Sequence, residues 1–510
     1  MKVKYNQKLL KMKKLTIVLL AFAALFVGCR KESSEKRILK FEFTTLSVEA
    51  TISEGAKTIV AQVPENTDVT NLVPTITISA KASVDPASGV PQNFTNPKTY
   101  VVTAEDGSNT SYTVTVTKGS GGGGGGGQAT EPTTIDGSIS ANTTWPDLGL
   151  PVDYIIDGYC YIEGNAALTI EPGVTIMFTG ANGAIVVEQD AGIHMVGTPD
   201  KHIRLVNATN NNNHGAWRYF HVISNRADNV MEYVDFINGG SNDGGEVLLV
   251  DGTLSMKHCL IDGSRGIGMY VNGKLTAFEY NTIKNCESYP LGISEADHIN
   301  QLGTGNEYTD NTKNMIWFDH YWIDNGTENS TFTFTNQGIP YHITDGMNVD
   351  ENNILFVNPG CEFVVAYNKE IVVSEGSLIQ VNGSRGGTPE VIFRGETSGS
   401  GTWRGLKVRT SRHTGNNVHS WLNGCIIDGA GIDDDGALYT EEDTWLTLYQ
   451  VTISNSGSYG LNIEIPLFED SDDYYFNIHH VMGSSMIFDN CASGNVWERT
   501  KELVYDAIPE

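Results

Sequence analysis

The sequence predicts an all-β protein in which a small β-sandwich precedes a long solenoid of stacked β-strands. Glycine is abundant, with 55 residues against 16 prolines, and short runs rich in Val, Ile, Thr, Tyr and Phe alternate with Asn, Asp and Gly. Such runs favour strands, and the residues between them favour tight turns. Similar segments also recur along the second part of the 510-residue chain, which is too long for one compact core.

Residues 1–28 have the features of a lipoprotein signal peptide. Several lysines precede an apolar run, LTIVLLAFAALFV, and Gly28 and Cys29 follow it. The run is shorter than the roughly 20 residues of a spanning helix, which favours cleavage and lipidation of Cys29 over an uncleaved signal anchor. Phe26 stands where bacterial lipoproteins usually have Leu. We expect residues 29–37 to be a polar tether and the protein to be an outer membrane lipoprotein of the cell envelope, facing the surface or the periplasm.

Residues 38–118 are predicted to form the β-sandwich. Short alternating strands are expected at KFEF, TIVAQV, TITISA, TYVVTA and SYTVTVT. The segments VPENTDVTNLVPTITIS and YVVTAEDGSNTSYTVTV resemble an immunoglobulin-like module of unknown function that follows the lipid anchor in Bacteroidetes surface lipoproteins. This resemblance implies a spacer. Residues 119–128 contain seven consecutive glycines and are expected to be a flexible linker.

Residues 129–500 are predicted to be one elongated body built twice, over about 140–330 and 338–495. PVDYIIDG, IEPGVTIMF, GAWRYFHV, YVDFINGG and HCLIDGSRG recur in order as PYHITDG, VNPGCEFVV, GTWRGLKV, GCIIDGAG and TISNSGSYG. A shorter repeat places Ile237, Ile261 and Ile283 in the same apolar-then-turn pattern. These spacings fit the rungs of a β-solenoid, about 15 in number and roughly 70 Å long at 4.8 Å a rung.

Each rung would leave its inward Ile, Val, Leu and Phe side chains exposed if it stood alone, so the rungs must stack to bury them. LTIEPGVTIMF and the strand in GTWRGLKV resemble the right-handed parallel β-helix proteins of Bacteroidetes, including pectate-lyase-like solenoids. The resemblance covers most of residues 140–495 and implies the fold. It leaves the function open, because this fold carries both enzymes and binding proteins.

Composition and motifs exclude several function classes. The formal net charge of −28 argues against nucleic-acid binding. No GxSxG, HExxH or Walker-type motif is present, and the cysteines form no CxxC pair. Cys160, Cys259, Cys286, Cys361, Cys425 and Cys491 are expected to be buried thiols in a solenoid core, with disulfides as the alternative.

The densest basic segment of the solenoid is WRGLKVRTSRH, whose alternation turns Lys407 and Arg409 outward. These two residues are the candidate catalytic groups of a lyase, which needs a base and a group that neutralises a uronate. The first copy has His221 and Ile223 at the matching positions, whereas Trp and Arg persist in both copies. Persistence of the Trp-Arg pair is typical of a structural corner.

The segment GIDDDGALYTEE resembles part of a calcium loop, with Asp433, Asp435 and Glu442 as candidate ligands. Gly431 occupies the first ligand position, so a solvated loop between rungs is the alternative. A second acidic run, at 469–473, is expected to be an exposed insertion, and neighbouring His479 and His480 are not expected to share a metal ion. No other cofactor is predicted. The adjacent tyrosines Tyr474 and Tyr475 could stack on sugar rings or pack on neighbouring strands.

The leading hypothesis is a lipid-anchored envelope protein whose β-helix is a non-catalytic glycan-binding or adhesive module. The alternative is a polysaccharide lyase or glycoside hydrolase acting on a complex glycan, and a purely architectural spacer is the third possibility. A groove where Lys or Arg meets convergent carboxylates would favour the enzyme, and an aromatic-lined face would favour binding. Apart from the membrane and a polysaccharide, the sequence indicates no partner.

Overall fold

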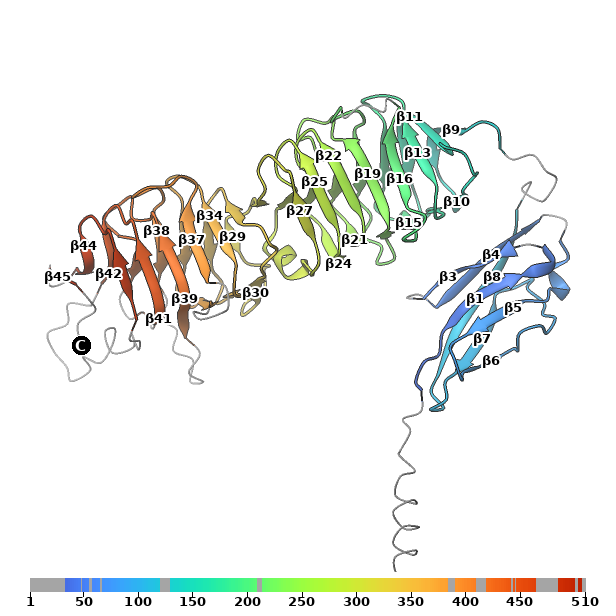
Figure 1. Cartoon of the computed structure of the whole chain (residues 1–510), viewed down its shortest axis with the longest axis horizontal. Coiled ribbons are helices and arrows are strands. Elements are labelled where there is room, and N and C mark those ends of the chain that lie inside the picture. The colour runs from blue at the N-terminus through green and yellow to red at the C-terminus, as the bar shows by residue number, and fades with distance from the viewer. Residues whose placement is uncertain are drawn as a thin grey trace, which may run out of the picture. The chain divides into compact units, whose positions relative to one another are not determined.

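A computed structural model describes residues 33–46, 48–54, 57–64, 67–119, 129–208, 213–383, 390–409, 419–441, 444, 446–464, 485–499 and 503–506. The chain separates into two compact units, residues 1–127 and 128–510 (Figure 1). The predicted signal peptide, Cys29 and the glycine run lie outside the described residues. Within the described ranges, no helix is both long enough and apolar enough to cross a membrane.

The first unit is a β-sandwich of a three-stranded and a five-stranded sheet, ordered β2-β1-β5 and β3-β4-β8-β7-β6. Its elements are β1 (Ile38–Phe43), η1 (Thr44–Leu46), β2 (Val48–Glu49), β3 (Thr51–Ser53), β4 (Thr58–Pro64), η2 (Val69–Asn71), β5 (Thr75–Ile78), β6 (Ser83–Asp85), β7 (Lys98–Thr103) and β8 (Asn109–Gly119). Alternate side chains of these strands point inward, where Phe41, Phe43, Phe94 and Tyr100 pack their rings edge to face or stacked. The predicted sandwich is confirmed.

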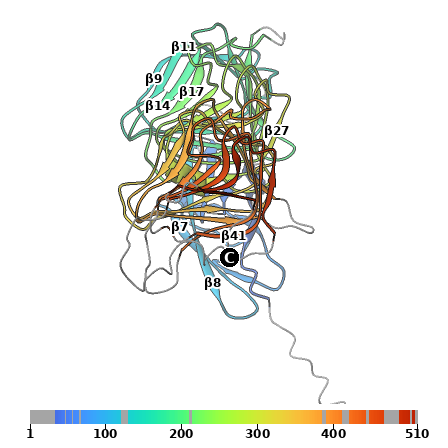
Figure 2. The same ribbon diagram turned by 90° about the vertical axis from the view of Figure 1, so that its left-hand side faces the viewer.

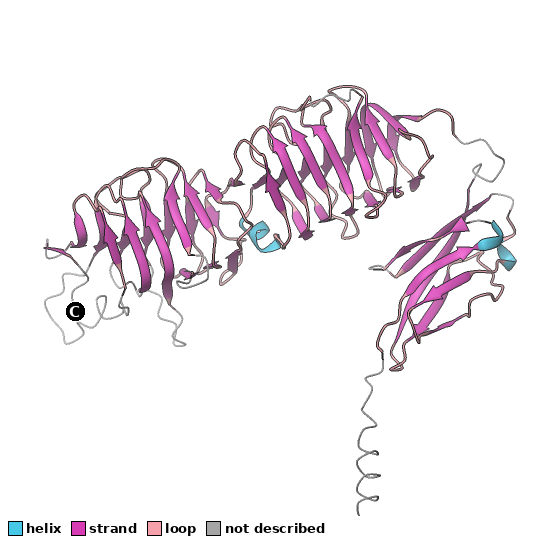
Figure 3. Cartoon of the chain, in the orientation of Figure 1, coloured by secondary structure: helices cyan, strands magenta, loops and turns pink. Residues whose placement is uncertain are grey.

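The second unit is a right-handed parallel β-helix, and almost all of its regular structure is strand (Figure 3). Its strands stack on three faces. Face 1 comprises β9 (Thr133–Ile139), the first part of β11 (Tyr154–Ile162), β13 (Thr175–Phe178), β16 (Ile203–Asn207), β19 (Val234–Gly239), β22 (Leu260–Ser264), β25 (Thr282–Cys286), β27 (Glu307–Thr309), β30 (Thr331–Phe334), β33 (Ile354–Val357), β36 (Leu378–Asn382) and the first parts of β39 (Ser420–Asp428) and β41 (Leu446–Ser454).

Face 2 runs the length of the β-helix. It comprises the second parts of β9 and β11, β14 (Ala184–Val187), β17 (Tyr219–Val222), β20 (Leu248–Val250), β23 (Met269–Val271), β26 (Leu291–Ile293), β28 (Ile316–Phe318), β31 (Tyr341–Ile343), β34 (Glu362–Val365), β37 (Val391–Gly395), the second parts of β39 and β41, and β43 (Ile487–Asp489). Neighbouring strands such as β14 and β17 lie side by side in a second view (Figure 2). The fourteen strands named here, all among the described residues, are one fewer than the roughly 15 rungs estimated from the sequence.

Face 3 consists of two sheets. The first comprises β10 (Thr143–Trp145), β12 (Ala167–Ile170), β15 (Gly192–Val196), β18 (Val230–Glu232), β21 (Thr253–Lys257) and β24 (Lys274–Glu279). The second comprises β29 (Trp322–Ile323), β32 (Met347–Val349), β35 (Glu370–Val373), β38 (Gly405–Val408), β40 (Leu438–Thr440), β42 (Tyr459–Ile463), β44 (Gly494–Glu498) and β45 (Leu503–Tyr505). The short helix η3 (Ala296–Gln301) occupies the rung between β24 and β29, so this face is interrupted where face 2 is continuous.

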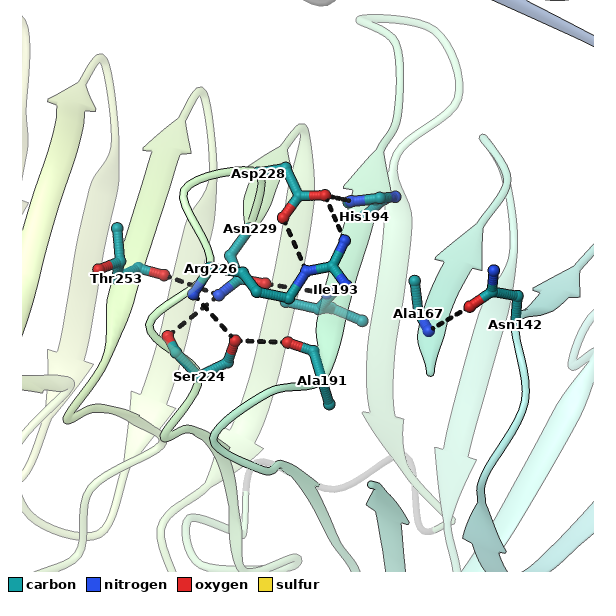
Figure 4. A network of polar contacts seen from close by, with 10 residues as sticks. All are labelled: Asn142, Ala167, Ala191, Ile193, His194, Ser224, Arg226, Asp228, Asn229 and Thr253. Atoms are coloured by element: carbon teal, nitrogen blue, oxygen red, sulfur yellow. Dashed lines mark hydrogen bonds and ion pairs between the residues drawn. The ribbon is translucent and has the colours of Figure 1, made fainter. Parts of the chain in front are cut away.

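The inward side chains of all three faces form one continuous apolar core, as stacking of rungs requires. Corners are closed by buried asparagines, whose amides replace missing backbone partners. Asn229 accepts from the Ile193 N–H (3.0 Å) and donates to the carbonyls of Ser224 and Thr253 (Figure 4). At other corners the chain turns through left-handed residues, for example Asn285 (φ 55°). The turns expected at the Asn, Asp and Gly residues between the strands are therefore present at these corners.

An ion-pair network lies on face 3 beside this corner (Figure 4). Arg226 donates to both carboxylate oxygens of Asp228, at 2.9 and 2.6 Å, and His194 Nε2 lies 3.1 Å from Asp228 Oδ2. The hydrogen bonds with Arg226 lower the pKa of Asp228 to about 2. Because Asp228 is half exposed, this pair orders the loop but adds little to the free energy of unfolding.

The expected register is wrong at one position. Ile261 pairs with Ile283 as predicted, but the residue that pairs with Ile261 on the preceding rung is Phe236. Ile237 instead pairs with Asp262 and points outward, half buried. A one-residue shift moves a side chain to the opposite surface of a strand, so the apolar Ile237 was mistaken for the core residue beside it.

The two copies recognised in the sequence occupy the three faces differently. IEPGVTIMF contributes β13 on face 1, whereas its counterpart VNPGCEFVV contributes β34 on face 2. GAWRYFHV contributes β17 on face 2, and GTWRGLKV contributes β38 on face 3. Corresponding segments are thus displaced by one face around the β-helix.

Candidate functional site

Lys407 lies on face 3 at the centre of a cluster of acids. Its ammonium is 2.7 Å from Asp435 Oδ2, 2.9 Å from Glu370 Oε2 and 3.8 Å from Asp433 Oδ2. The side chain is only 5% exposed. Lys407 therefore meets several convergent carboxylates, as the enzyme hypothesis required, but it does so as a buried group.

The charge state of Lys407 does not suit a catalytic base. Burial alone would lower the pKa of this ammonium, but the hydrogen bonds with Asp435 and Glu370 outweigh burial and leave the pKa raised. Lys407 is then a cation at neutral pH, held by its neighbours. Arg409, the second candidate, lies two residues further on and is half buried, with its backbone N–H donating to the Val373 carbonyl. This arrangement favours a structural role.

The proposed calcium ligands belong to the same cluster. Asp433 and Asp435 both face the Lys407 ammonium, and Arg404 and Arg499 approach them at 3.8 and 3.7 Å. Glu442 lies outside the described residues. Among the described residues, no group of three or more His, Cys, Asp or Glu side chains is arranged to hold a metal ion.

Three further candidates from the sequence also fall outside the described residues. They are the acidic run at 469–473, the tyrosine pair Tyr474 and Tyr475, and the histidine pair His479 and His480.

The cysteines predicted as buried thiols are free in the structure. Five of them are buried, and Cys491 is partly exposed. Burial raises the pKa of each buried thiol, to about 12 for Cys160, Cys259, Cys286, Cys361 and Cys425. They act as small apolar residues of the core and not as nucleophiles.

The outward side chains of face 2 form a ladder rich in aromatic rings. In register from rung to rung they are Tyr161, Val186, His221, Leu249, Tyr270, Gly292, Trp317, His342, Val364 and Arg394. Because side chains alternate along a strand, the inward neighbours of these residues belong to the core. The ladder crosses the junction at η3 without a break.

One group of rings, which we name the second aromatic cluster, consists of Tyr270, Tyr289, Trp317 and His342. Tyr270 and Trp317 are two rungs apart, about 9.6 Å along the axis, yet their ring centroids are only 5.8 Å apart. They lean together over Gly292, where a Cβ atom would lie 2.6 Å from Tyr270 Cδ2 and 3.3 Å from Trp317 Cε3. Glycine at this rung therefore lets the two rings meet.

A series of polar contacts from Lys313 to Glu396 holds two members of the second aromatic cluster, Tyr289 and His342. Lys313 Nζ donates to the Tyr289 hydroxyl (3.2 Å), which lies 2.6 Å from His342 Nδ1, and His342 Nε2 lies 2.5 Å from Glu396 Oε1. Burial lowers the pKa of His342 more than Glu396 raises it, so the imidazole is neutral at neutral pH. Tyr289 stacks on Trp317 at 5.7 Å and 17°. These contacts hold the Tyr289 ring in place, and through the stacking they fix the orientation of the Trp317 ring.

The first aromatic cluster lies nearer the N-terminal end of face 2 and consists of Tyr159, Tyr161, Tyr219 and His221. Tyr159 and Tyr161 are stacked at 5.5 Å, and Tyr219 meets both Tyr159 and His221 edge to face. The Arg218 guanidinium lies over the Tyr219 ring at 5.3 Å. All four rings are half buried.

A second ladder, which we name the polar ladder, runs beside the aromatic one, two residues further along each strand. Its members are Asp251, Asn272, Ser294, Asp319, Thr344, Ala366 and Glu396, each directly after the last paired residue of its rung. The two ladders are linked: the Tyr270 hydroxyl donates to Asp319 (3.2 Å) and Trp317 Nε1 donates to Thr344 Oγ1 (2.9 Å). Asp251, Asn272 and Glu396 are exposed.

Aromatic faces beside hydrogen-bonding groups are what a sugar-binding surface needs, because a ring can cover the apolar side of a sugar while polar groups bind its hydroxyls. The residues that form this surface were not singled out in the sequence. Their positions on successive rungs depend on loop lengths that vary, so only the strand register brings them together.

Comparison with known protein families matches both units. Residues 38–116 match the family model described as "SGBP, N-terminal", the N-terminal module of surface glycan-binding proteins. Residues 137–244 match the model described as "Pectate-lyase like beta helix domain". No curated protein matches the chain.

Two solved structures from Bacteroides show local similarity. One, described as a "putative glycoside hydrolase" from Bacteroides thetaiotaomicron, is 31% identical over 18% of this chain and 27% of its own, with a TM-score of 0.16. The other, a "putative secreted protein" from Bacteroides fragilis, is 21% identical over 18% of this chain and 98% of its own, with a TM-score of 0.14. The chain thus spans about a quarter of the first structure, and neither similarity extends to the overall fold. The two family matches confirm the resemblance to Bacteroidetes surface proteins in which an N-terminal immunoglobulin-like module precedes a pectate-lyase-like β-helix.

Proposed function

We propose that this chain is a lipid-anchored envelope protein whose β-helix binds a glycan along face 2 without cleaving it. The observation that carries the proposal is the pair of aromatic clusters beside the polar ladder, on the face that continues past η3. The N-terminal match to surface glycan-binding proteins supports both a carbohydrate ligand and a location at the cell surface.

The spacing of carboxylates along face 2 favours binding over hydrolysis. Asp251, Asp319 and Glu396 recur at every third rung, about 14 Å apart along the axis. Paired catalytic carboxylates of glycoside hydrolases lie about 5–5.5 Å or 6.5–9.5 Å apart. Carboxylates on this ladder are therefore too far apart for either arrangement.

The ionisable side chains of the second aromatic cluster are also engaged by the protein. Both ring nitrogens of His342 have partners, and its side chain is 4% exposed. A general base needs an unoccupied nitrogen within reach of the substrate. His342 is thus better suited to positioning Tyr289 and Trp317 than to accepting a proton from a sugar.

The length of the ladder sets the size of the ligand. From Tyr161 to Trp317 there are six rung steps, or about 29 Å, which is long enough for several sugar residues. Contacts at the two aromatic clusters act together when one chain spans both. We therefore expect affinity to rise with oligosaccharide length until the ligand reaches both clusters.

The test is to measure retention of the full chain by neutral and charged polysaccharides in affinity gels, together with the masses of any products. Tyr270→Ala removes a ring from the second aromatic cluster, and Tyr449→Ala removes an exposed tyrosine from face 1 as a matched control. A central aromatic contact contributes about 2 kcal/mol, so Tyr270→Ala should weaken binding about thirtyfold and Tyr449→Ala should not. Released oligosaccharides would support the alternative, a lyase or glycoside hydrolase, and absence of any retention would refute glycan binding.

The membrane anchor is tested separately. Cys29→Ala removes the thiol that a lipid would modify, so the variant should appear in the soluble fraction while the parent protein sediments with membranes. Continued membrane retention of Cys29→Ala would contradict the anchor.

A further inference from the structure

We propose that face 2 selects uncharged glycans and rejects polyanionic ones, such as polyuronates. This inference rests on the proposed function and names the ligand class of the same surface. It follows from which charged groups line the polar ladder and which groups neutralise them.

Two carboxylates of the polar ladder, Asp319 and Glu396, have neutral partners. Asp319 accepts from the Tyr270 hydroxyl, and Glu396 is held by His342, which is neutral at neutral pH. Asp251 Oδ2 lies 2.7 Å from His221 Nε2. A hydroxyl or a neutral imidazole leaves the negative charge in place, so Asp319 and Glu396 remain anionic acceptors for donors of a ligand.

Among the described residues, no hydrogen bond or ion pair engages the second oxygen of these carboxylates, and the side chains of Asp251 and Glu396 are 41% and 40% exposed. Sugar hydroxyls are donors as well as acceptors, so they can bind these oxygens directly. A uronate carboxylate or a sulfate has no proton to donate at neutral pH. It would bring a like charge next to the ladder instead.

The cations near face 2 do not offset these charges. Arg394 donates to Glu362 Oε1 at 2.6 Å, so it is already paired. Lys313 lies over the Tyr289 ring at 4.6 Å, and Arg218 lies over the Tyr219 ring. Lys313 and Arg218 thus place one cation at each aromatic cluster. A polyanion bound along face 2 would also place negative charges next to the carboxylates that lie between and beyond the two clusters.

The remainder of the chain adds to this preference. The formal net charge of the full 510-residue chain is −28, and a strongly negative protein repels polyanions at low ionic strength. Salt screens such repulsion within about 10 Å at 0.1 M. Rejection of anionic glycans should therefore weaken as salt is added, while binding of neutral glycans should change little.

The experiment compares a polyuronate with its uncharged methyl ester and with neutral polysaccharides. Polygalacturonate and its fully methyl-esterified form are run with the full chain beside a panel of neutral hexose polysaccharides, at 20 mM and 500 mM NaCl. We expect at least one neutral polymer to bind. At 20 mM NaCl its affinity should exceed that of polygalacturonate tenfold or more, since a single like-charge contact at the surface lowers affinity about fivefold.

Asp319→Asn tests whether the ladder is responsible, with the exposed loop residue Asp200→Asn as the matched control. Asp319→Asn should reduce the ratio of the affinities for neutral and anionic polymers about fivefold, and Asp200→Asn should leave this ratio unchanged. Polyuronate binding equal to or tighter than that of every neutral polymer at low salt would overturn the inference while leaving glycan binding intact. Failure of all polymers to bind would instead refute the proposed function, and this inference with it.

Discussion

Replacing Lys407 by methionine should destabilise the second half of the β-helix by about 3 kcal/mol. The substitution removes an ammonium that lies within 3 Å of both Asp435 and Glu370. Removing one partner of a buried ion pair costs about 3–5 kcal/mol, because the remaining charge is left in a poorly hydrated site. The three carboxylates are 24–31% exposed, so water relieves part of that cost and the lower end of the range applies.

The assay is urea unfolding followed by tryptophan fluorescence, since Trp403 is buried four residues before Lys407. With a urea dependence of roughly 1–3 kcal/mol per molar, the midpoint should fall by at least about 1 M. Lys369→Met is the matched control, because Lys369 forms an exposed pair with Asp345 at 3.3 Å and such pairs contribute under about 1 kcal/mol.

The pH dependence separates lost charge pairing from lost packing. Burial raises the folded-state pKa of Asp433 and the Lys407 ammonium lowers it, so without Lys407 this pKa should rise further above its unfolded value. The folded state then binds more protons, so the stability of the variant falls as pH rises through this range and recovers on acidification to about pH 4. Equal midpoints for Lys407→Met and Lys369→Met would refute the argument. Loss of a glycan-cleaving activity without any change in midpoint would instead restore the catalytic role.

Three further predictions concern the core and the junction at η3. Burial lowers the pKa of His298 to about 4. Since the unfolded imidazole binds its proton near pH 6.5, the free energy of unfolding should fall by about 3 kcal/mol as pH drops from 6.5 to 4. Urea titrations of His298→Gln should show a weaker dependence of stability on pH. Gly292→Ala should force the Tyr270 and Trp317 rings apart, costing about 1–3 kcal/mol and weakening glycan retention; unchanged tryptophan fluorescence and binding would disprove the contact. The five buried thiols should react with a thiol reagent only after unfolding, whereas Cys491 should react earlier; rapid labelling of Cys259 in the native protein would count against the packing described.

The fold class could be predicted because it depends on local pattern and repetition. The run from Leu168 to Phe178 shows alternating apolar residues around a Pro-Gly turn, and the structure places both parts as strands with alternate residues buried. Register was less predictable. Ile237 and Phe236 are both large and apolar, so the sequence alone does not indicate which one points inward.

The functional surface could not be predicted from single motifs. Tyr270, Gly292 and Trp317 lie on three consecutive rungs, and the loops between them differ in length and include η3. Lys407, by contrast, stood out because it lies in a locally basic segment. Local charge density proved to mark a buried ion cluster, whereas the aromatic ladder has no local signature.

Because the two copies are displaced by one face, matching their sequences did not identify the residues of face 2. His221 and Lys407 match in sequence, yet His221 belongs to the ladder of face 2 and Lys407 to face 3. Beyond η3, face 2 is therefore continued by segments that correspond to face 1 of the first copy, such as β31 and β34. Trp317 and His342, contributed by β28 and β31, complete the second aromatic cluster at this change of segments. Tyr270, Tyr289 and Trp317 all lie in the first copy, so the displacement contributes only His342 to this cluster, and it places this imidazole 2.6 Å from the Tyr289 hydroxyl, where it holds the ring that stacks on Trp317.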